Sequence, residues 1–119
     1  MAAKLEISTQ HTALTDDLQK YIAKKIGRLD RFAPRVARES MHIQVKLKES
    51  RAKDKKQFTC AVIVHLPQQV LEAEESTINM FAAVDIAETK LRHQLKKYKE
   101  THTKRRVHQR LLRRLRNSS

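Results

Sequence analysis

The sequence is poor in the residues that disulfide-bonded and base-stacking proteins rely on. Its 119 residues include one cysteine, one glycine, two prolines, five aromatic residues and no tryptophan. Cys60 alone can form no internal disulfide, and its place in an apolar run favours a buried thiol over a redox or nucleophilic one. With so few aromatic side chains, the sequence is poorly supplied with broad stacking platforms for single-stranded RNA. Phosphate and shape recognition should therefore dominate any contact with nucleic acid.

Motifs for catalysis and metal binding are also missing. The sequence has no glycine-rich phosphate loop, no nucleophile motif and no convincing pair of carboxylates. Its six histidines form no helical i, i+4 pair and join no cysteine cluster. We therefore expect no catalytic residue, no metal site and no cofactor. No apolar run approaches the roughly 20 residues of a membrane span, and no apolar signal segment is present, so we expect a cytoplasmic protein without a membrane partner.

Positive charge is abundant and unevenly placed. The formal net charge is +13, and the stretch from residue 90 onward holds twelve Lys or Arg residues against one acid, Glu100. The first 89 residues hold fourteen bases and twelve acids. A basic block of this density attracts nucleic acid by neutralising phosphates and releasing counterions. The alternative is a disordered, solubilising tail.

Alternating apolar residues predict four strands in a chain that is long enough for one domain. The expected strands cover residues 4–8, 41–47, 58–66 and 70–75, and the polar run 49–56 reads as a hairpin loop. Three consecutive hairpin-connected strands make an antiparallel meander.

Helical spacing predicts two helices on one face of that sheet. The first begins after the N-cap Thr15 and ends near residues 31–33; it contains Gly27, which close packing on the sheet would justify. The second begins at Ser76 or Thr77. Its apolar stripe consists of Met80, Ala83, Val84, Ala87, Leu91, Leu95 and Tyr98. The predicted fold class is α+β in the order β-α-β-β-β-α.

Two basic ridges border the apolar stripe of the second helix. Placing residues at 100° intervals puts Lys90, His93, Lys97 and Lys104 on one flank and Arg92, Lys96 and Lys99 on the other. The first helix offers Lys20, Lys24, Lys25, Arg28 and Arg31. We expect a phosphate-binding groove between the two helices, to which the second helix contributes Lys90, His93, Lys97 and Lys99.

After Tyr98 the stripe is interrupted, so the second helix either continues into solvent or frays near residues 101–103. A separate short basic helix over 107–116 is a further alternative, although such a segment is marginal alone. We therefore expect a domain over 1–100 and a basic tail over 101–119.

Two stretches resemble the ribosome hibernation promoting factor family, also called ribosome-associated inhibitors or sigma modulation proteins, in its short form. One is Asn79-Met80-Phe81-Ala82-Ala83-Val84-Asp85, followed by Lys90-Leu91-Arg92-His93-Gln94-Leu95-Lys96-Lys97-Tyr98-Lys99. The other is Leu14-Thr15-Asp16-Asp17-Leu18 through Lys25, Arg28, Leu29 and Phe32. The similarity covers about residues 4–100.

The resemblance implies a non-catalytic translation inhibitor that lies in the messenger and transfer-RNA channel of the small ribosomal subunit. Its expected partners are that subunit and its ribosomal RNA, with a ribosome-pairing modulation factor left open, and it would be a monomer off the ribosome. The expected RNA-binding residues are Lys25, Arg28, Lys90, Arg92, His93, Gln94, Lys97, Lys99, Lys104, Arg105 and Arg106.

Three positions depart from the family pattern: Asn79 replaces the usual Asp, Phe81 the usual Tyr and His93 the usual Arg. An unperturbed histidine is mostly neutral at pH 7, so His93 should weaken one phosphate contact. The alternative functions are a general duplex-RNA-binding or ribosome-structural protein, an RNA-cleaving enzyme that uses histidines, and a membrane-surface binder that uses residues 107–116.

Overall fold

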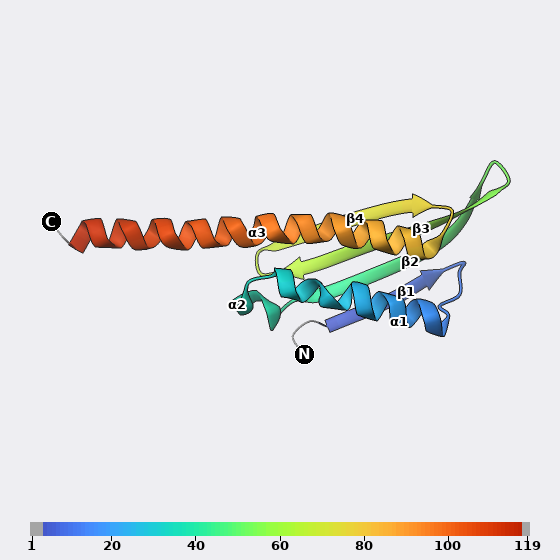
Figure 1. The fold of residues 1–119 in the computed structure, drawn as a ribbon, viewed down its shortest axis with the longest axis horizontal. Helices are drawn as coiled ribbons and strands as arrows, with labels where there is room; N and C mark the ends of the chain where they lie inside the picture. Colours follow the sequence, from blue (N-terminus) through green and yellow to red (C-terminus); the bar gives the residue numbers. More distant parts are fainter. Residues whose placement is uncertain (1–3, 118–119) are drawn as a thin grey trace.

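Four strands form one sheet, and the helices cover only one of its faces (Figure 1). The structure is a computed structural model that describes residues 4–117, with side chains described as far as Thr101. The elements are β1 (Lys4–Gln10), α1 (Asp16–Lys25), the 3-10 helix η1 (Gly27–Phe32), α2 (Arg35–Arg38), β2 (His42–Ala52), β3 (Lys55–Leu66), β4 (Gln69–Thr77) and α3 (Met80–Asn117). The predicted α+β class and the order β-α-β-β-β-α are confirmed, with the short α2 as an addition.

The strands lie in the order β1-β2-β3-β4. β1 pairs with β2 in parallel, and the other two pairs are antiparallel, which confirms the meander. A parallel pair needs a long crossover, and here the segment that contains α1, η1 and α2 supplies it. This crossover places α1 over the same face of the sheet as α3.

The hairpin between β2 and β3 is tighter than its polar sequence predicts. Only Lys53 and Asp54 lie between the two strands, and both have positive φ, 53° and 65°. Positive φ at both central residues is typical of a type I′ turn, whose twist matches that of the flanking strands. The predicted loop over 49–56 is therefore wrong. The polar run extends the ladder beyond the helices, so its polarity reflects missing cover and not missing strand pairing.

The first helix begins as predicted but changes type halfway. The Thr15 Oγ1 accepts a hydrogen bond from the Leu18 amide at 3.2 Å, which confirms the N-cap. The α-helix ends at Lys25, and the chain continues as the tighter η1 to Phe32. A Cβ built on Gly27 would meet no atom within 4 Å. Close packing therefore does not explain this glycine.

Replacing Gly27 by alanine is expected to raise the free energy of unfolding by about 0.4–1 kcal/mol. Gly27 does not have positive φ, and the added methyl group meets no neighbour, so the main effect is a less flexible unfolded chain. Urea denaturation measures the change. Ala23→Gly on the exposed side of α1 is the control and should lower stability by about 1 kcal/mol. A destabilised Gly27→Ala variant would show that η1 needs glycine for its backbone.

The second helix begins later than predicted. Ser76 and Thr77 still belong to β4, and Asn79 is the N-cap: its Oδ1 accepts hydrogen bonds from the amides of Phe81 at 2.8 Å and Ala82 at 3.3 Å. Asn79 thus caps the helix, as the Asp that is usual at this position in the family could also do. α3 runs without interruption past the sheet (Figure 1), so neither fraying near 101–103 nor a separate helix over 107–116 is observed.

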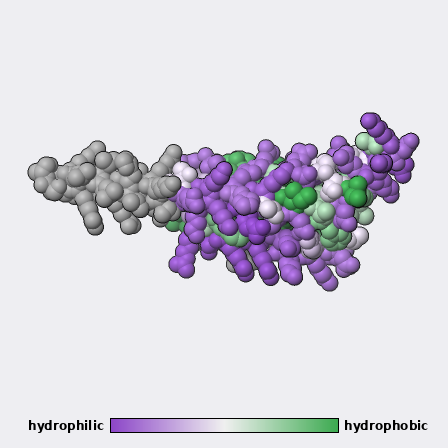
Figure 2. Space-filling model, turned by 45° about the horizontal axis from the view of Figure 1, so that its top comes forward, coloured by the Kyte–Doolittle hydropathy of each residue, from purple (hydrophilic) through white to green (hydrophobic). Residues whose placement is uncertain are grey.

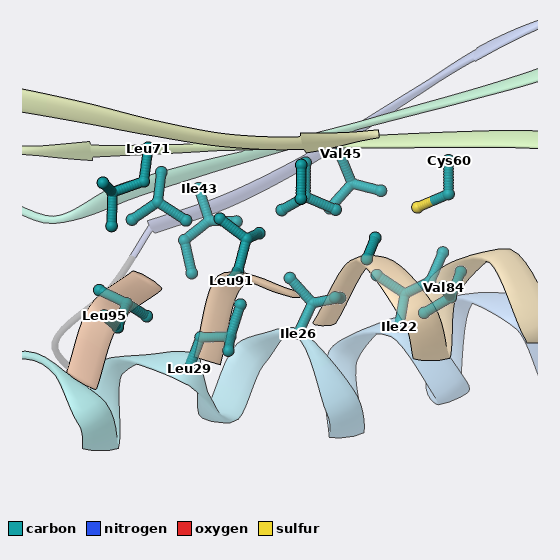
Figure 3. Close-up of a cluster of buried hydrophobic side chains, with 14 of the residues drawn as sticks. Ile22, Ile26, Leu29, Ile43, Val45, Cys60, Leu71, Val84, Leu91 and Leu95 are labelled. Atoms are coloured by element: carbon teal, nitrogen blue, oxygen red, sulfur yellow. The ribbon is translucent and has the colours of Figure 1, made fainter. Parts of the chain in front are cut away.

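The core lies in a single layer between the sheet and the helices (Figure 3). All seven residues of the predicted stripe of α3 are buried, from Met80 to Tyr98. Cys60 is fully buried, and this burial raises the pKa of its thiol to about 12, which supports the structural reading of this residue. Within residues 4–117, no helix has the length and apolar character required to cross a membrane.

Candidate nucleic-acid interface

A groove of about 450 Å³ lies between α1 and η1 on one side and α3 on the other. Its lining combines five basic side chains with two carboxylates: Lys24, Lys25, Arg28, Arg31, Phe32, Asp85, Glu88, Thr89 and Arg92. The predicted groove between the two helices is therefore present, and its net charge is positive.

The first wall of the groove is a row of basic residues on α1 and η1. Lys24, Lys25, Arg28 and Arg31 are all exposed, and residues three or four apart lie on the same face of a helix. The Lys25 Nζ lies 5.8 Å from the centroid of the Tyr21 ring, a distance typical of a weak cation–π contact. Lys25 is thus held at the groove with its charge accessible.

The second wall is formed by the flank of α3 that carries Arg92 and Lys96. The Arg92 Cζ lies 6.0 Å and the Lys96 Nζ 5.5 Å from the centroid of the Phe32 ring in η1. The Arg92 Nε also lies 3.7 Å from the Glu88 Oε1 one turn earlier. Phe32 therefore brings two cations of α3 toward the cations of η1. Lys96 is absent from the predicted site, although the helical projection places it on the same flank as Arg92.

A partly buried hydrogen bond joins the two helices beside the groove. The Tyr21 hydroxyl of α1 donates to the Asp85 Oδ1 of α3. This hydrogen bond, followed by burial and the charges of Asp85 and Glu88, raises the pKa of Tyr21 to about 12. Tyr21 also meets Phe81 edge-on, with ring centroids 5.2 Å apart. The phenol stays neutral at physiological pH and fixes the position of the Asp85 carboxylate.

The opposite flank of α3 contacts β4 and not α1. The Lys90 Nζ lies 2.6 Å from the Glu75 Oε2 and donates to the Glu74 carbonyl at 3.4 Å, and the Gln94 Nε2 donates to the Glu72 carbonyl at 2.9 Å. Lys90 and Arg92 are separated by about 200° around the helix, so they cannot face the same groove. The prediction that the Lys90 ridge lines the groove is wrong, because the groove faces the ridge with Arg92 and Lys96.

The eleven predicted RNA-binding residues thus fall into four groups. Lys25, Arg28 and Arg92 line the groove, while Lys90 and Gln94 connect α3 to β4. His93, Lys97 and Lys99 are exposed on α3, and Lys104, Arg105 and Arg106 lie outside the described side chains. Across the side chains that the structure describes, no three or more His, Cys, Asp or Glu residues gather as a metal site.

Hydrophilic surface covers most of the described part of the face in Figure 2, and hydrophobic surface is confined to small patches. The exposed large hydrophobic side chains among the described residues are Val36, Val70, Ile78, Phe81 and Ile86. This surface suits a polar, charged partner.

Comparisons with known proteins agree with the fold. The family described as "Sigma 54 modulation protein / S30EA ribosomal protein" matches residues 5–103. A protein of Staphylococcus aureus (strain COL) named "Ribosome hibernation promotion factor" is 31% identical over 96 residues, which are 81% of this chain and 48% of that protein. The chain therefore spans about half the length of this curated relative.

Two solved structures share the fold. The N-terminal domain of Thermus thermophilus Protein Y has a TM-score of 0.60 and 26% sequence identity, with 82% of this chain and 99% of that chain covered. A ribosomal subunit interface protein from Coxiella burnetii has a TM-score of 0.64 and 24% identity, with 84% and 99% covered.

Proposed function

Because the chain belongs to the sigma 54 modulation protein / S30EA ribosomal protein family, we propose that it binds the small ribosomal subunit and inhibits translation there. It does so by occupying the channel that otherwise receives messenger and transfer RNA. Its site of action is the cytoplasm, where ribosomes work. The names of the Staphylococcus and Coxiella relatives, a hibernation promotion factor and a subunit interface protein, support the ribosome as the partner.

The observation that carries the proposal is the basic groove between the two helices. Four cations of α1 and η1 face Arg92 of α3 across it, so phosphates in the groove would be approached from both sides. Arginine binds phosphate oxygens through two parallel hydrogen bonds, which fixes orientation as well as providing affinity. A rigid α+β core holds the two walls together through the bond between Tyr21 and Asp85.

The length of α3 extends the basic surface beyond the groove. The molecule measures 71 Å along its longest axis but only 30 and 17 Å along the others. Residues 101–119 hold seven Lys or Arg residues and no acid. A rod of this charge supports contact with phosphates far from the groove, and Lys104, Arg105 and Arg106 are proposed to bind RNA there.

The exposed side chains of α3 outside the groove are proposed as secondary contacts. Lys97, Lys99 and His93 are exposed, and the two lysines carry charge. Lys90 and Gln94 already bind β4, so an RNA contact by either would compete with these bonds. We therefore propose that Lys25, Arg28 and Arg92 contribute more to RNA binding than the residues of α3 outside the groove.

The inhibition is proposed to be steric and not catalytic. Bound protein should block transfer-RNA binding to the small subunit while ribosomal RNA stays intact. The protein is incubated with isolated ribosomal subunits, followed by sedimentation, a transfer-RNA binding assay and gel analysis of the RNA. Naked duplex RNA serves as the control ligand and should bind at least tenfold more weakly.

Two results would contradict this prediction. Equal affinity for duplex RNA and for the small subunit would favour the general duplex-RNA-binding alternative. Strand breaks that depend on the protein would show that it is a nuclease.

A further inference from the structure

The groove contains carboxylates that a site for phosphate alone would not be expected to retain. Asp85 and Glu88 lie in its lining beside the basic residues. The Glu88 side chain is 13% exposed and that of Arg92 is 38% exposed, while the cations of α1 and η1 are exposed. The deeper part of the groove is therefore acidic and its outer part is basic. Phosphates would be repelled from the deep part and attracted to the outer part.

A ligand that suits both parts has an anionic end and a neutral end with N–H donors. A nucleotide fits this description, because its phosphate can lie among the cations while its base enters the groove. The volume of about 450 Å³ also lies in the range of about 300–1,000 Å³ that is usual for sites that bind small molecules.

The acidic end selects among the bases. Guanine presents two adjacent N–H donors on its Watson–Crick edge, which one carboxylate can accept together. Adenine and cytosine place an acceptor nitrogen beside their amino group, and uracil has one N–H between two carbonyl groups. Each of these three would bring an acceptor close to the carboxylate, which is unfavourable.

Glu88 is better placed than Asp85 to accept the guanine edge. Asp85 already accepts the Tyr21 hydroxyl through its Oδ1. The Glu88 Oε1 forms an ion pair with the Arg92 Nε at 3.7 Å, a distance too long for a direct hydrogen bond, so its oxygens can still accept hydrogen bonds from a ligand. The guanidinium plane of Arg92, next to Phe32, supplies a surface on which a base can stack.

We propose that the groove between η1 and α3 binds one guanine nucleotide, whose base donates to Glu88 and whose phosphate binds Arg28 and Arg31. The nucleotide is either a residue unstacked from ribosomal RNA or a free mononucleotide, since both present the same groups. Only the RNA source rests on the proposed ribosomal function.

Isothermal titration calorimetry of the full chain with 5′-GMP, 5′-AMP and 5′-UMP at low salt tests this inference. GMP is expected to bind at least tenfold more tightly than the other two. Glu88→Gln keeps the shape of the side chain but replaces one acceptor oxygen by a donor, so it should reduce the preference for GMP to less than twofold. Glu74→Gln on the uncovered face of the sheet is the matched control and should retain the full preference.

A second arm replaces the mononucleotides by single-stranded pentanucleotides with or without one central guanine. Guanine preference in both arms supports the site and is expected if the ligand is an RNA residue. Guanine preference with mononucleotides only also supports the site and identifies a free mononucleotide as the ligand. Equal affinity for all bases in both arms, or a preference that survives Glu88→Gln, overturns it. Sedimentation of the wild-type chain with small subunits is measured separately, so a failure of the ribosomal proposal leaves the mononucleotide result interpretable.

Discussion

Replacing Lys25 and Arg28 together by glutamate is expected to lower the affinity for the small ribosomal subunit by at least about a hundredfold. Both side chains line the basic wall of the groove and are exposed, so neither supports the core. A hydrogen bond to a charged group is worth about 1.5–3 kcal/mol, and loss of two corresponds to roughly 10² to 10⁴ in affinity. Repulsion between the new carboxylates and phosphate adds to this loss.

The matched control is Lys46→Glu with Lys48→Glu on the uncovered face of β2. Both double variants change the net charge from +13 to +9, because each reversal removes two positive charges. Lys46 and Lys48 are exposed and point away from the helices. Sedimentation with small subunits and circular dichroism are measured for both variants. An equal loss of affinity in both would mean that net charge, and not the groove, determines binding.

Lys90 is less suitable for such a test, although it belongs to the predicted site. Its ammonium group pairs with Glu75 and donates to the Glu74 carbonyl. Lys90→Glu would place two carboxylates side by side where α3 contacts β4. Loss of binding in that variant would therefore report on the packing of α3 as much as on RNA contact.

Deleting residues 101–119 is expected to reduce the salt dependence of subunit binding by about three to six units of slope in log affinity against log salt. The deletion removes seven bases and no acid, and each neutralised phosphate contributes about 0.7–0.9 to the slope. The melting temperature should change by less than about 2 °C, because Tyr98 is the last buried residue of α3 among the described side chains, which end at Thr101.

Binding measured between about 50 and 200 mM salt checks the prediction. A full-length variant with the seven bases replaced by glutamine separates charge from helix length and should show the same slope as the deletion. An unchanged slope after deletion would mean that the tail is a solvated appendage. A markedly lower melting temperature would instead place the end of the core beyond residue 100.

Local chemistry was sufficient to predict the four strands, the two long helices and the inward face of each, but not η1 or α2. The stripe from Met80 to Tyr98 and the inward faces of the strands follow from repeats of 3.6 and 2 residues. The structure buries the stripe and most of the inward strand residues, whereas Leu5, Ile7 and Phe58 are only partly buried. Thr15 was recognisable as an N-cap because a side-chain oxygen before a helix satisfies an otherwise unpaired amide. Such signals depend only on neighbours in the chain.

The predicted ends of strands and helices were less accurate where a polar segment pairs as a strand or where a later residue caps the helix. The β2–β3 ladder continues through a polar run, because backbone pairing does not require buried side chains. Ser76 and Thr77 resemble helix starts, yet both complete the ladder with β3, and Asn79 takes the capping role.

The site was predicted in part. Lys25 and Arg28 follow from the charge pattern and the family resemblance, and the sequence by itself determined that the two sides of α3 are basic. Only the tertiary structure decided which side faces the groove. The apolar stripe fixes the face of α3 that is buried but not its neighbours, and the crossover of α1 beside α3 assigns Arg92 and Lys96 to the groove and Lys90 to β4. The contact between Tyr21 and Asp85, 64 residues apart, arises from that same packing and has no signal in the local sequence.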